Sequence, residues 1–215
     1  SLRCYSNQLT NLDVSNNTAL TSLRCYSNQL TNLDVSQNTA LDYLNCQFNQ
    51  LTNLDVINNT ALTVLYCGFN QLTTLDASQN TALIILNCSS NQLTSLDFRN
   101  GNNQNLLNFN VTSNPNLTCI NVDDVTYSTN NWTNIDAQHY FSTNCQTYVP
   151  DDNFEAYLEA NGMGNGIAND DSVTTSNISG VSILDVSNQN IADLTGIEDF
   201  TALTRLSCYN NQLTS

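Results

Sequence analysis

The chain has 215 residues; 40% are hydrophobic, 19 are acidic and 4 are basic, which gives a formal net charge of -15. This balance excludes an ordinary nucleic-acid-binding surface, because almost nothing is present to neutralise phosphates. It also argues against docking on an anionic membrane. No stretch approaches the roughly 18 apolar residues of a spanning helix, so membrane insertion is not expected.

A repeat of 21 residues runs through the first half of the chain. One unit reads LTSLRCYSN at 20–28 and LTNLDVSQN at 30–38. In each half, apolar residues alternate over three positions, which predicts a short strand with its apolar side chains turned inward. Two strands per unit predict two parallel sheets that face each other across a narrow core. The asparagine that ends each half suits a turn, where its side chain can bond the backbone of the neighbouring coil.

The motif LxxLxCxxNxL resembles the defining segment of leucine-rich repeats, and LxxLDVSxN resembles the nested short bacterial variety called the IRREKO type. The resemblance implies a β-solenoid with two short parallel strands per 21-residue coil and one short cap helix. It also implies a bacterial surface protein that acts in recognition. A single unit cannot fold alone, since ordering its backbone costs more than its apolar burial returns.

The repeat degrades after Leu96, so the chain is expected to hold four segments. Residues 1–118 are the array and residues 119–146 a C-terminal cap with aromatic residues. Pro150 and the following acids begin a short amphipathic helix over 151–159, which ends before Gly162. Residues 147–180 resemble the N-terminal cap of internalin-like proteins, and residues 181–215 start a second array. The chain is expected to be a window from a longer tandem protein.

Six of the eight cysteines are expected to be free and buried, because they take an inward strand position about 4.8 Å from their neighbours with parallel side chains. This core ladder consists of Cys4, Cys25, Cys46, Cys67, Cys88 and Cys208. Cys119 takes an outward position, and Cys145 lies 26 residues later at the end of the cap. A Cys119–Cys145 disulfide is expected, which implies an oxidising, extracellular or cell-surface location.

The sequence offers little for catalysis, and we expect no enzyme and no cofactor. The one histidine, His139, lies among cap aromatics and is interpreted as structural. Outward aspartates recur in successive coils, including Asp13, Asp34 and Asp55. Hydrogen bonds to nearby Ser, Thr or backbone are the preferred interpretation, because stacked carboxylates otherwise raise one another's pKa. Weak calcium binding there, or at Asp170 and Asp171, remains an alternative.

The candidate ligand-binding residues lie on the outward face of the cysteine-bearing strands, where the units vary and aromatic residues gather. They are Tyr5, Arg24, Tyr26, Tyr43, Phe48, Tyr66 and Phe69. An equally weighted alternative is that the two phenylalanines fill the turn core and the tyrosines are merely solvated strand residues.

Two functions are therefore expected from the sequence. The first is a non-catalytic extracellular recognition or adhesion module that binds a protein or carbohydrate on a cell surface. The alternative is a structural stalk or filament of tandem or end-to-end stacked copies. Ice binding through Thr10, Thr31, Thr52 and Thr73 is a poor third, because the threonine ladder is single and its flanks are charged.

Overall fold

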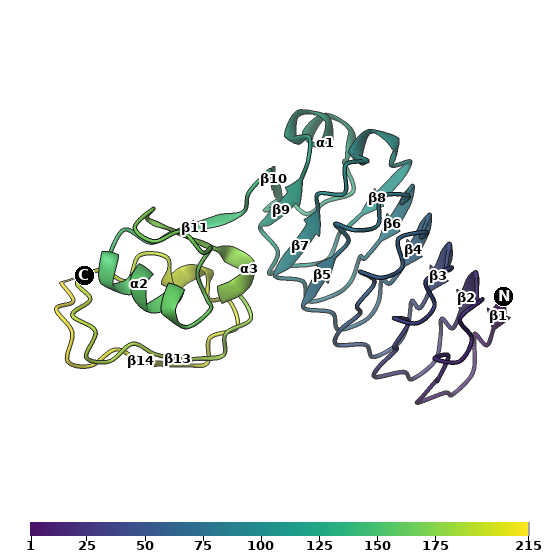
Figure 1. The fold of residues 1–215 in the computed structure, drawn as a ribbon, viewed down its shortest axis with the longest axis horizontal. Helices are drawn as coiled ribbons and strands as arrows, with labels where there is room; N and C mark the ends of the chain where they lie inside the picture. The colour runs from purple at the N-terminus through teal and green to yellow at the C-terminus, as the bar shows by residue number, and fades with distance from the viewer. Residues whose placement is uncertain (215) are drawn as a thin grey trace. The chain divides into compact units, whose positions relative to one another are not determined.

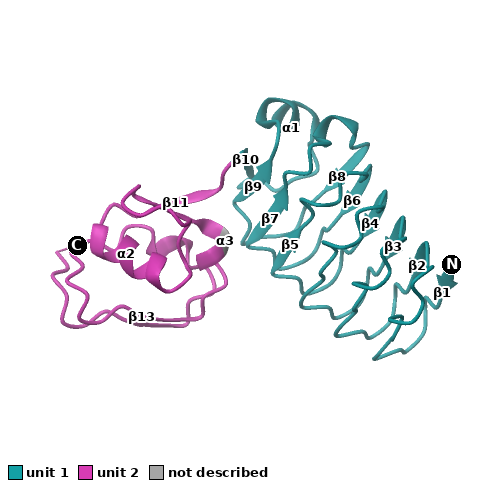
Figure 2. Cartoon of the chain, in the orientation of Figure 1, with its two compact units in different colours: residues 1–143 teal, residues 144–215 magenta. Residues whose placement is uncertain are grey.

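The computed structural model describes residues 1–214. The chain forms two compact units, Ser1–Thr143 and Asn144–Ser215, each with its own core (Figure 2). No helix within the described residues is both long and apolar enough to span a bilayer.

The first unit is a solenoid whose coils each contribute one strand to a six-stranded parallel sheet in the order β1-β2-β3-β4-β6-β8 (Figure 1). The register advances by one coil per strand, so that Leu23 faces Leu44 and Leu44 faces Leu65. The strands are β1 (Leu2–Arg3), β2 (Ser22–Arg24), β3 (Tyr43–Asn45), β4 (Val64–Tyr66), β6 (Ile85–Asn87) and β8 (Asn108–Asn110).

A second parallel sheet forms along the other half of the coils, but it starts only in the fourth coil. Its strands are β5 (Thr74–Asp76), β7 (Ser95–Phe98), β9 (Cys119–Val122) and β10 (Tyr140–Ser142). The expected second strand is therefore missing from the first three coils. Asparagine disfavours strands whereas threonine favours them. The first three coils carry asparagine at the position of Thr74, namely Asn11, Asn32 and Asn53.

The core of this unit follows the repeat. Leu23, Leu44 and Leu65 are fully buried, as are the cysteines that follow two residues later in the same coils. The same inward positions recur in every coil, so burial is shared between neighbours, as expected for a solenoid.

The end of the solenoid is closed by helical turns and aromatic packing. Helix α1 (Val125–Asn131) begins at Asp124, whose carboxylate accepts a hydrogen bond from the Tyr127 N–H. A 3-10 turn, η1 (Asn103–Asn105), lies against it. Beneath them Trp132 stacks on Phe109 with ring centroids 4.3 Å apart. The sequence did not predict α1, because its residues are β-branched and polar rather than good helix formers.

The second unit contains the predicted helix. Helix α2 (Asp152–Ala160) begins after Asp151, whose carboxylate accepts from the N–H groups of Asn153 and Phe154, and the prediction of a helix here is confirmed. Phe154 and Leu158 are fully buried in the core of this unit. The other elements are β11 (Gln146–Tyr148) antiparallel to β12 (Ser172–Thr174), α3 (Thr175–Ile178), β13 (Ile183–Asp185) parallel to β14 (Arg205–Ser207), and the 3-10 turn η2 (Ile197–Asp199).

Candidate recognition surface

Each coil of the first unit turns sharply after its strand, and an asparagine holds that turn; it is exposed in the first coil, at Asn7, and buried in the coils that follow. In the third coil the Asn49 side-chain oxygen accepts from the Leu30 N–H at 3.0 Å. Its amide nitrogen donates to the carbonyls of Cys25 and Cys46 at 3.1 and 3.0 Å. The predicted bonding of turn asparagines to a neighbouring coil is thus confirmed. Because the turns from the second coil onward are held the same way, side chains at equal positions stand in columns across the sheet.

We define the recognition face as the outward side chains of β1, β2, β3, β4, β6 and β8 with the two turn residues after the cysteine or valine in each coil. It contains all seven predicted candidates. Tyr5, Phe48 and Phe69 are exposed, whereas Arg24, Tyr26, Tyr43 and Tyr66 are half-buried.

The aromatic rings of this face contact one another from coil to coil. Tyr5 and Tyr26 are stacked with centroids 4.6 Å apart and planes 4° from parallel. Tyr43 and Tyr66 meet at 6.2 Å in a tilted arrangement. The Arg24 guanidinium carbon lies 4.5 Å from the centroid of the Tyr43 ring, a cation–π contact. These contacts join Tyr5 to Tyr26 and link Arg24, Tyr43 and Tyr66 across three successive coils.

Phe48 and Phe69 form a second stack in the adjoining turns. Their ring centroids are 4.3 Å apart, and the planes differ by 13°. The side chains are 49% and 46% exposed, so the alternative in which they fill the turn core is wrong. Both residues have positive φ, 54° and 55°. Bulky residues rarely adopt this conformation, and Ser6, Ser27, Ser90 and Ser113 occupy it in other coils.

The outward aspartates lie on the opposite row of half-coils and are hydrogen-bonded locally. The side-chain oxygen of Asp13 accepts from the Ser15 N–H at 2.9 Å, and that of Asp34 accepts from the Ser36 N–H at 2.9 Å. These serine hydrogen bonds lower the pKa of both carboxyls. Asp55 is bonded in the same manner to the Ile57 N–H. The geometry agrees with the interpretation that these aspartates are hydrogen-bonded locally, and calcium binding stays a prediction.

The cysteine ladder consists of free thiols. Cys25, Cys46, Cys67 and Cys88 are buried, whereas Cys4 and Cys208 are half-buried. Burial raises the pKa of Cys25 and of Cys88 to about 12. The thiols also face backbone acceptors; the Cys25 sulfur lies 3.7 Å from the Asn45 carbonyl oxygen. Such thiols are poor nucleophiles, because the reactive species is the thiolate.

The remaining two cysteines, Cys119 and Cys145, are disulfide-bonded. Both are buried, with exposed fractions of 7% and 5%. Cys119 begins β9, one residue before the inward Ile120, which pairs with Leu96 of the preceding strand. It therefore occupies the outward position in the repeat although it is covered.

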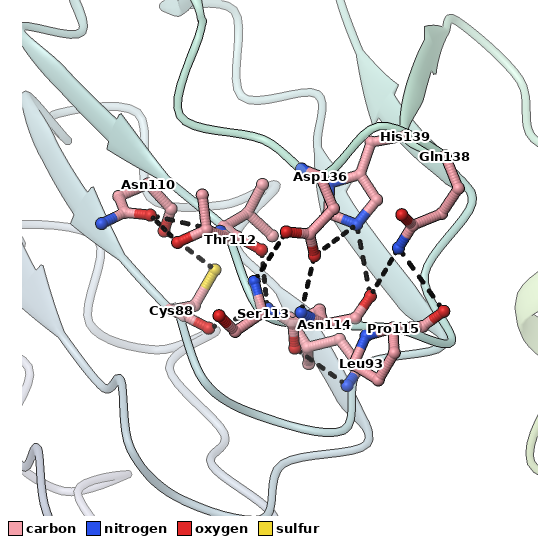
Figure 3. A network of polar contacts seen from close by, with 11 residues as sticks. Cys88, Leu93, Asn110, Thr112, Ser113, Asn114, Pro115, Asp136, Gln138 and His139 are labelled. Atoms are coloured by element: carbon pink, nitrogen blue, oxygen red, sulfur yellow. Dashed lines mark hydrogen bonds and ion pairs between the residues drawn. The ribbon is translucent and has the colours of Figure 1, made fainter.

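A polar network centred on His139 and Asp136 closes the solenoid at its capped end (Figure 3). The Asp136 carboxylate accepts from the N–H groups of Ser113 and Asn114 at 2.9 and 2.8 Å. In earlier coils the equivalent N–H groups donate to carbonyls of the next coil, as Phe48 does to Gly68. The Asp136 carboxylate thus takes the place of the backbone carbonyls that a further coil would supply. Partial burial opposes ionisation of Asp136, but the two N–H donors keep its pKa below the ordinary value.

His139 supports this carboxylate from a buried position. Its Nδ1 accepts from the Asp136 N–H at 3.1 Å, and its Nε2 lies 3.3 Å from the Asn114 carbonyl oxygen. This pattern fits the neutral ring with its proton on Nε2. Burial lowers the pKa of His139, which favours that neutral form. Both ring nitrogens are therefore engaged in the cap. The sequence assigned no role to Asp136, whose pattern with His139 gave no periodic signal.

One acidic cluster in the second unit has ligand atoms close enough for a metal ion: Asp152, Glu155 and Asp171 lie within 4.8 Å of one another. It includes Asp171 but not Asp170 of the predicted pair. The Glu155 carboxylate is buried and accepts from the N–H groups of Asp170 and Asp171 at 3.1 and 3.3 Å. These bonds give Glu155 a structural role in folding the loop.

Comparison with known proteins agrees with this architecture. The family model "Leucine Rich repeats (2 copies)" matches residues 39–80, which include β3, β4 and β5. The fold is a leucine-rich-repeat solenoid. The predicted fold class and the resemblance to leucine-rich-repeat proteins are thereby confirmed.

Two solved structures from Listeria monocytogenes are similar to the chain. The functional domain of InlJ, described as including a cysteine ladder, is 26% identical over 100% of this chain and 49% of that one, with a TM-score of 0.32. The internalin InlF of strain 4b F2365 is 24% identical over 61% of this chain and 38% of that one, with a TM-score of 0.46. The chain thus spans about half the length of the first and less of the second. Among curated proteins, none matches the chain.

Proposed function

We propose that the chain is a non-catalytic recognition and adhesion module of a bacterial surface or secreted protein, and that the recognition face binds a protein partner. The observation that carries this proposal is the exposed stack of Phe48 and Phe69 at positive φ. Such a conformation costs about 1–3 kcal/mol per residue. The contact between two stacked rings returns about 0.5–1.5 kcal/mol. Serines incur the same conformational cost in four other coils, so the turn itself does not require phenylalanine. A pair of exposed, stacked apolar rings at this position is what a binding partner would cover.

The surroundings of the stack support a protein partner. Tyr and Arg are enriched among the residues that dominate protein–protein affinity. Arg24, Tyr26, Tyr43 and Tyr66 lie half-buried on the same face and contact neighbouring rings. Their mutual contacts restrict the side chains before binding, which lowers the entropy lost when a partner is bound.

Two further features support the extracellular and non-catalytic parts of the proposal. The disulfide-bonded Cys119 and Cys145 suit an oxidising compartment. Both ring nitrogens of His139 are taken by the cap, which leaves the one imidazole of the chain without a position for general base work.

The stalk alternative retains one supporting feature, namely a second unit whose parallel strands β13 and β14 lie where the sequence predicts the start of another array. Stacking of copies on the capped end is disfavoured, because Asp136 already satisfies the Ser113 and Asn114 N–H groups that another coil would bond. A stalk built from tandem capped arrays is consistent with this cap, and it predicts no loss of attachment when the recognition face is altered.

The sequence itself supplies the substitutions that test the proposal. Phe48→Ser and Phe69→Ser install the residue that four other coils carry at this position, so the fold should tolerate them. Ile57→Ser is the matched control: Ile57 is exposed, lies in the turns of the opposite row, and replaces the serine found at Ser15 and Ser36. The assay is adhesion of protein-coated beads to a panel of cultured animal and bacterial cells.

We expect the double phenylalanine variant to lose most adhesion to any cell that binds the wild type, and Ile57→Ser to keep it. Protease treatment of the cells should abolish attachment. Undiminished adhesion by the folded double variant would overturn the proposal in favour of the stalk, and adhesion that survives protease would point to carbohydrate.

A further inference from the structure

We propose that the partner presents an acidic segment to the recognition face, and that Arg3 and Arg24 bind its carboxylates. This inference rests on the proposed function and specifies the chemistry of the partner. It is carried by the distribution of charge and of hydrogen-bond donors over the face, which differs from the rest of the chain.

Charge is segregated between the two rows of half-coils. The chain has 19 acids and 4 arginines, yet the recognition face has no acidic position and two of the four arginines. Asp42 precedes Tyr43 at the edge of the face, and its backbone carbonyl accepts from the Thr63 N–H. The recurrent aspartates stand on the other row. An acidic segment that approaches the chain is therefore favoured at this face over the row that carries the aspartates.

Within residues 1–214, neither Arg3 nor Arg24 forms an ion pair with a carboxylate. Among residues 1–214, the arginine with an ion pair is Arg99, which binds Asp97. Arg24 instead lies over the Tyr43 ring, and its buried Nε has no hydrogen-bond partner. Arg3 is exposed. A guanidinium held in place by a ring, without an anion, is prepared to bind a carboxylate in the bidentate geometry that arginine favours.

The asparagines of the face are oriented as donors. The side-chain oxygen of Asn45 accepts from the Gln47 N–H at 3.2 Å. That of Asn87 accepts from the Ser89 N–H at 3.0 Å, and that of Asn110 from the Thr112 N–H at 3.2 Å. A backbone N–H can only donate, so each bond fixes which amide atom is oxygen and leaves the NH2 group as the donor on the outward side chain. The face therefore offers donors to an acceptor-rich partner.

The stacked rings favour an acidic protein segment over an acidic glycan. Within the Tyr5–Tyr26 and Phe48–Phe69 pairs, each ring covers one face of the other. Sugar rings pack on open aromatic faces, and stacking removes one face of each ring from such packing while it leaves the ring edges free. Aromatic edges carry positive partial charge, which again suits carboxylates and carbonyls.

The test uses a labelled, capped decaglutamate peptide, with decaglutamine as its neutral match and alginate as a carboxylated glycan. The intact chain should bind decaglutamate at low salt, should not bind decaglutamine, and should lose the complex as salt screens the charges. Arg3→Gln and Arg24→Gln should each weaken binding about tenfold. Arg24→Lys should recover part of the loss, because it restores the charge without the planar group. Arg205→Gln is the control, since it removes the same charge from an exposed position in the second unit.

The outcomes separate this inference from the proposed function. Equal binding of the two peptides, equal loss in Arg205→Gln and Arg24→Gln, or tighter binding of alginate than of decaglutamate would each overturn the acidic-segment proposal. If any of these occurs while the double phenylalanine variant still loses cell adhesion, the recognition function stands and only the acidic partner falls. Arg3 is exposed, so Arg3→Gln remains informative even where Arg24→Gln fails to fold.

Discussion

Asn70→Ala tests how the coils are held together. The Asn70 side-chain oxygen accepts from the Leu51 N–H at 3.0 Å, and its amide nitrogen donates to the carbonyls of Cys46 and Cys67 at 3.1 and 3.0 Å. Alanine leaves the Leu51 N–H buried without a partner, which costs about 1–3 kcal/mol, and each lost donor bond costs about 0.5–1.5 kcal/mol. We therefore expect the free energy of unfolding of the first unit to fall by about 3 kcal/mol.

The assay is urea unfolding followed by the fluorescence of Trp132, which is the one tryptophan of the chain and lies buried in the cap of this unit. Asn58→Ala is the matched control, because Asn58 is exposed, and it should change the unfolding free energy by less than about 0.5 kcal/mol. Asn70→Asp should destabilise at least as much as alanine, since a carboxylate cannot donate to the two carbonyls. If Asn70→Ala lowered the free energy of unfolding no more than Asn58→Ala, the turn asparagines would not be what joins the coils.

The remaining predictions concern pH and thiol chemistry. Because burial lowers the pKa of folded His139, the unfolded chain takes up this proton first, and stability should fall as pH drops below about 6.5 towards the folded pKa. His139→Gln should remove this part of the pH dependence. An identical slope of unfolding free energy against pH in both proteins would contradict the prediction. The lowered pKa of Asp136 should cause a second loss of stability below about pH 3.9. Cys25, with its pKa raised to about 12 by burial, and Cys67 should resist iodoacetamide at about pH 8 until the chain unfolds. Rapid alkylation of Cys67 in the folded chain, read by peptide mass spectrometry, would show that the ladder is open.

The solenoid itself could be predicted from the sequence because its cause is periodic. Inward leucines and cysteines recur every coil, and the same residues are fully buried in the structure. The helix α2 was also predictable, since Asp151 caps it and Phe154 and Leu158 define one apolar side. In these places local propensity and the burial pattern favour the same structure.

The sequence did not predict those features of the structure whose sequence pattern is weak or not periodic. Whether a half-coil forms a strand depends on a small difference in propensity, as between Asn53 and Thr74. Helix α1 relies on a single cap at Asp124, and the role of Asp136 depends on contacts with residues more than 20 positions earlier.

For the recognition face, the repeat predicts which side chains align in columns across the coils, but it does not predict how exposed each side chain is. Phe48 and Phe69 align with serines in the sequence, and that mismatch was a usable signal for a functional turn. Their positive φ and open stacking were not readable, because the backbone conformation of the turn is set by hydrogen bonds between coils.

The most direct test of the recognition face is competition for a shared binding site in solution. Beads coated with the wild-type chain are allowed to attach to a cell type that binds them, in the presence of excess soluble variant. We expect soluble Ile57→Ser chain to block attachment as fully as the wild type, and the Phe48→Ser, Phe69→Ser double variant not to block it. Full blocking by the double variant, with its fold intact by circular dichroism, would show that the chain does not bind through Phe48 and Phe69 of the recognition face.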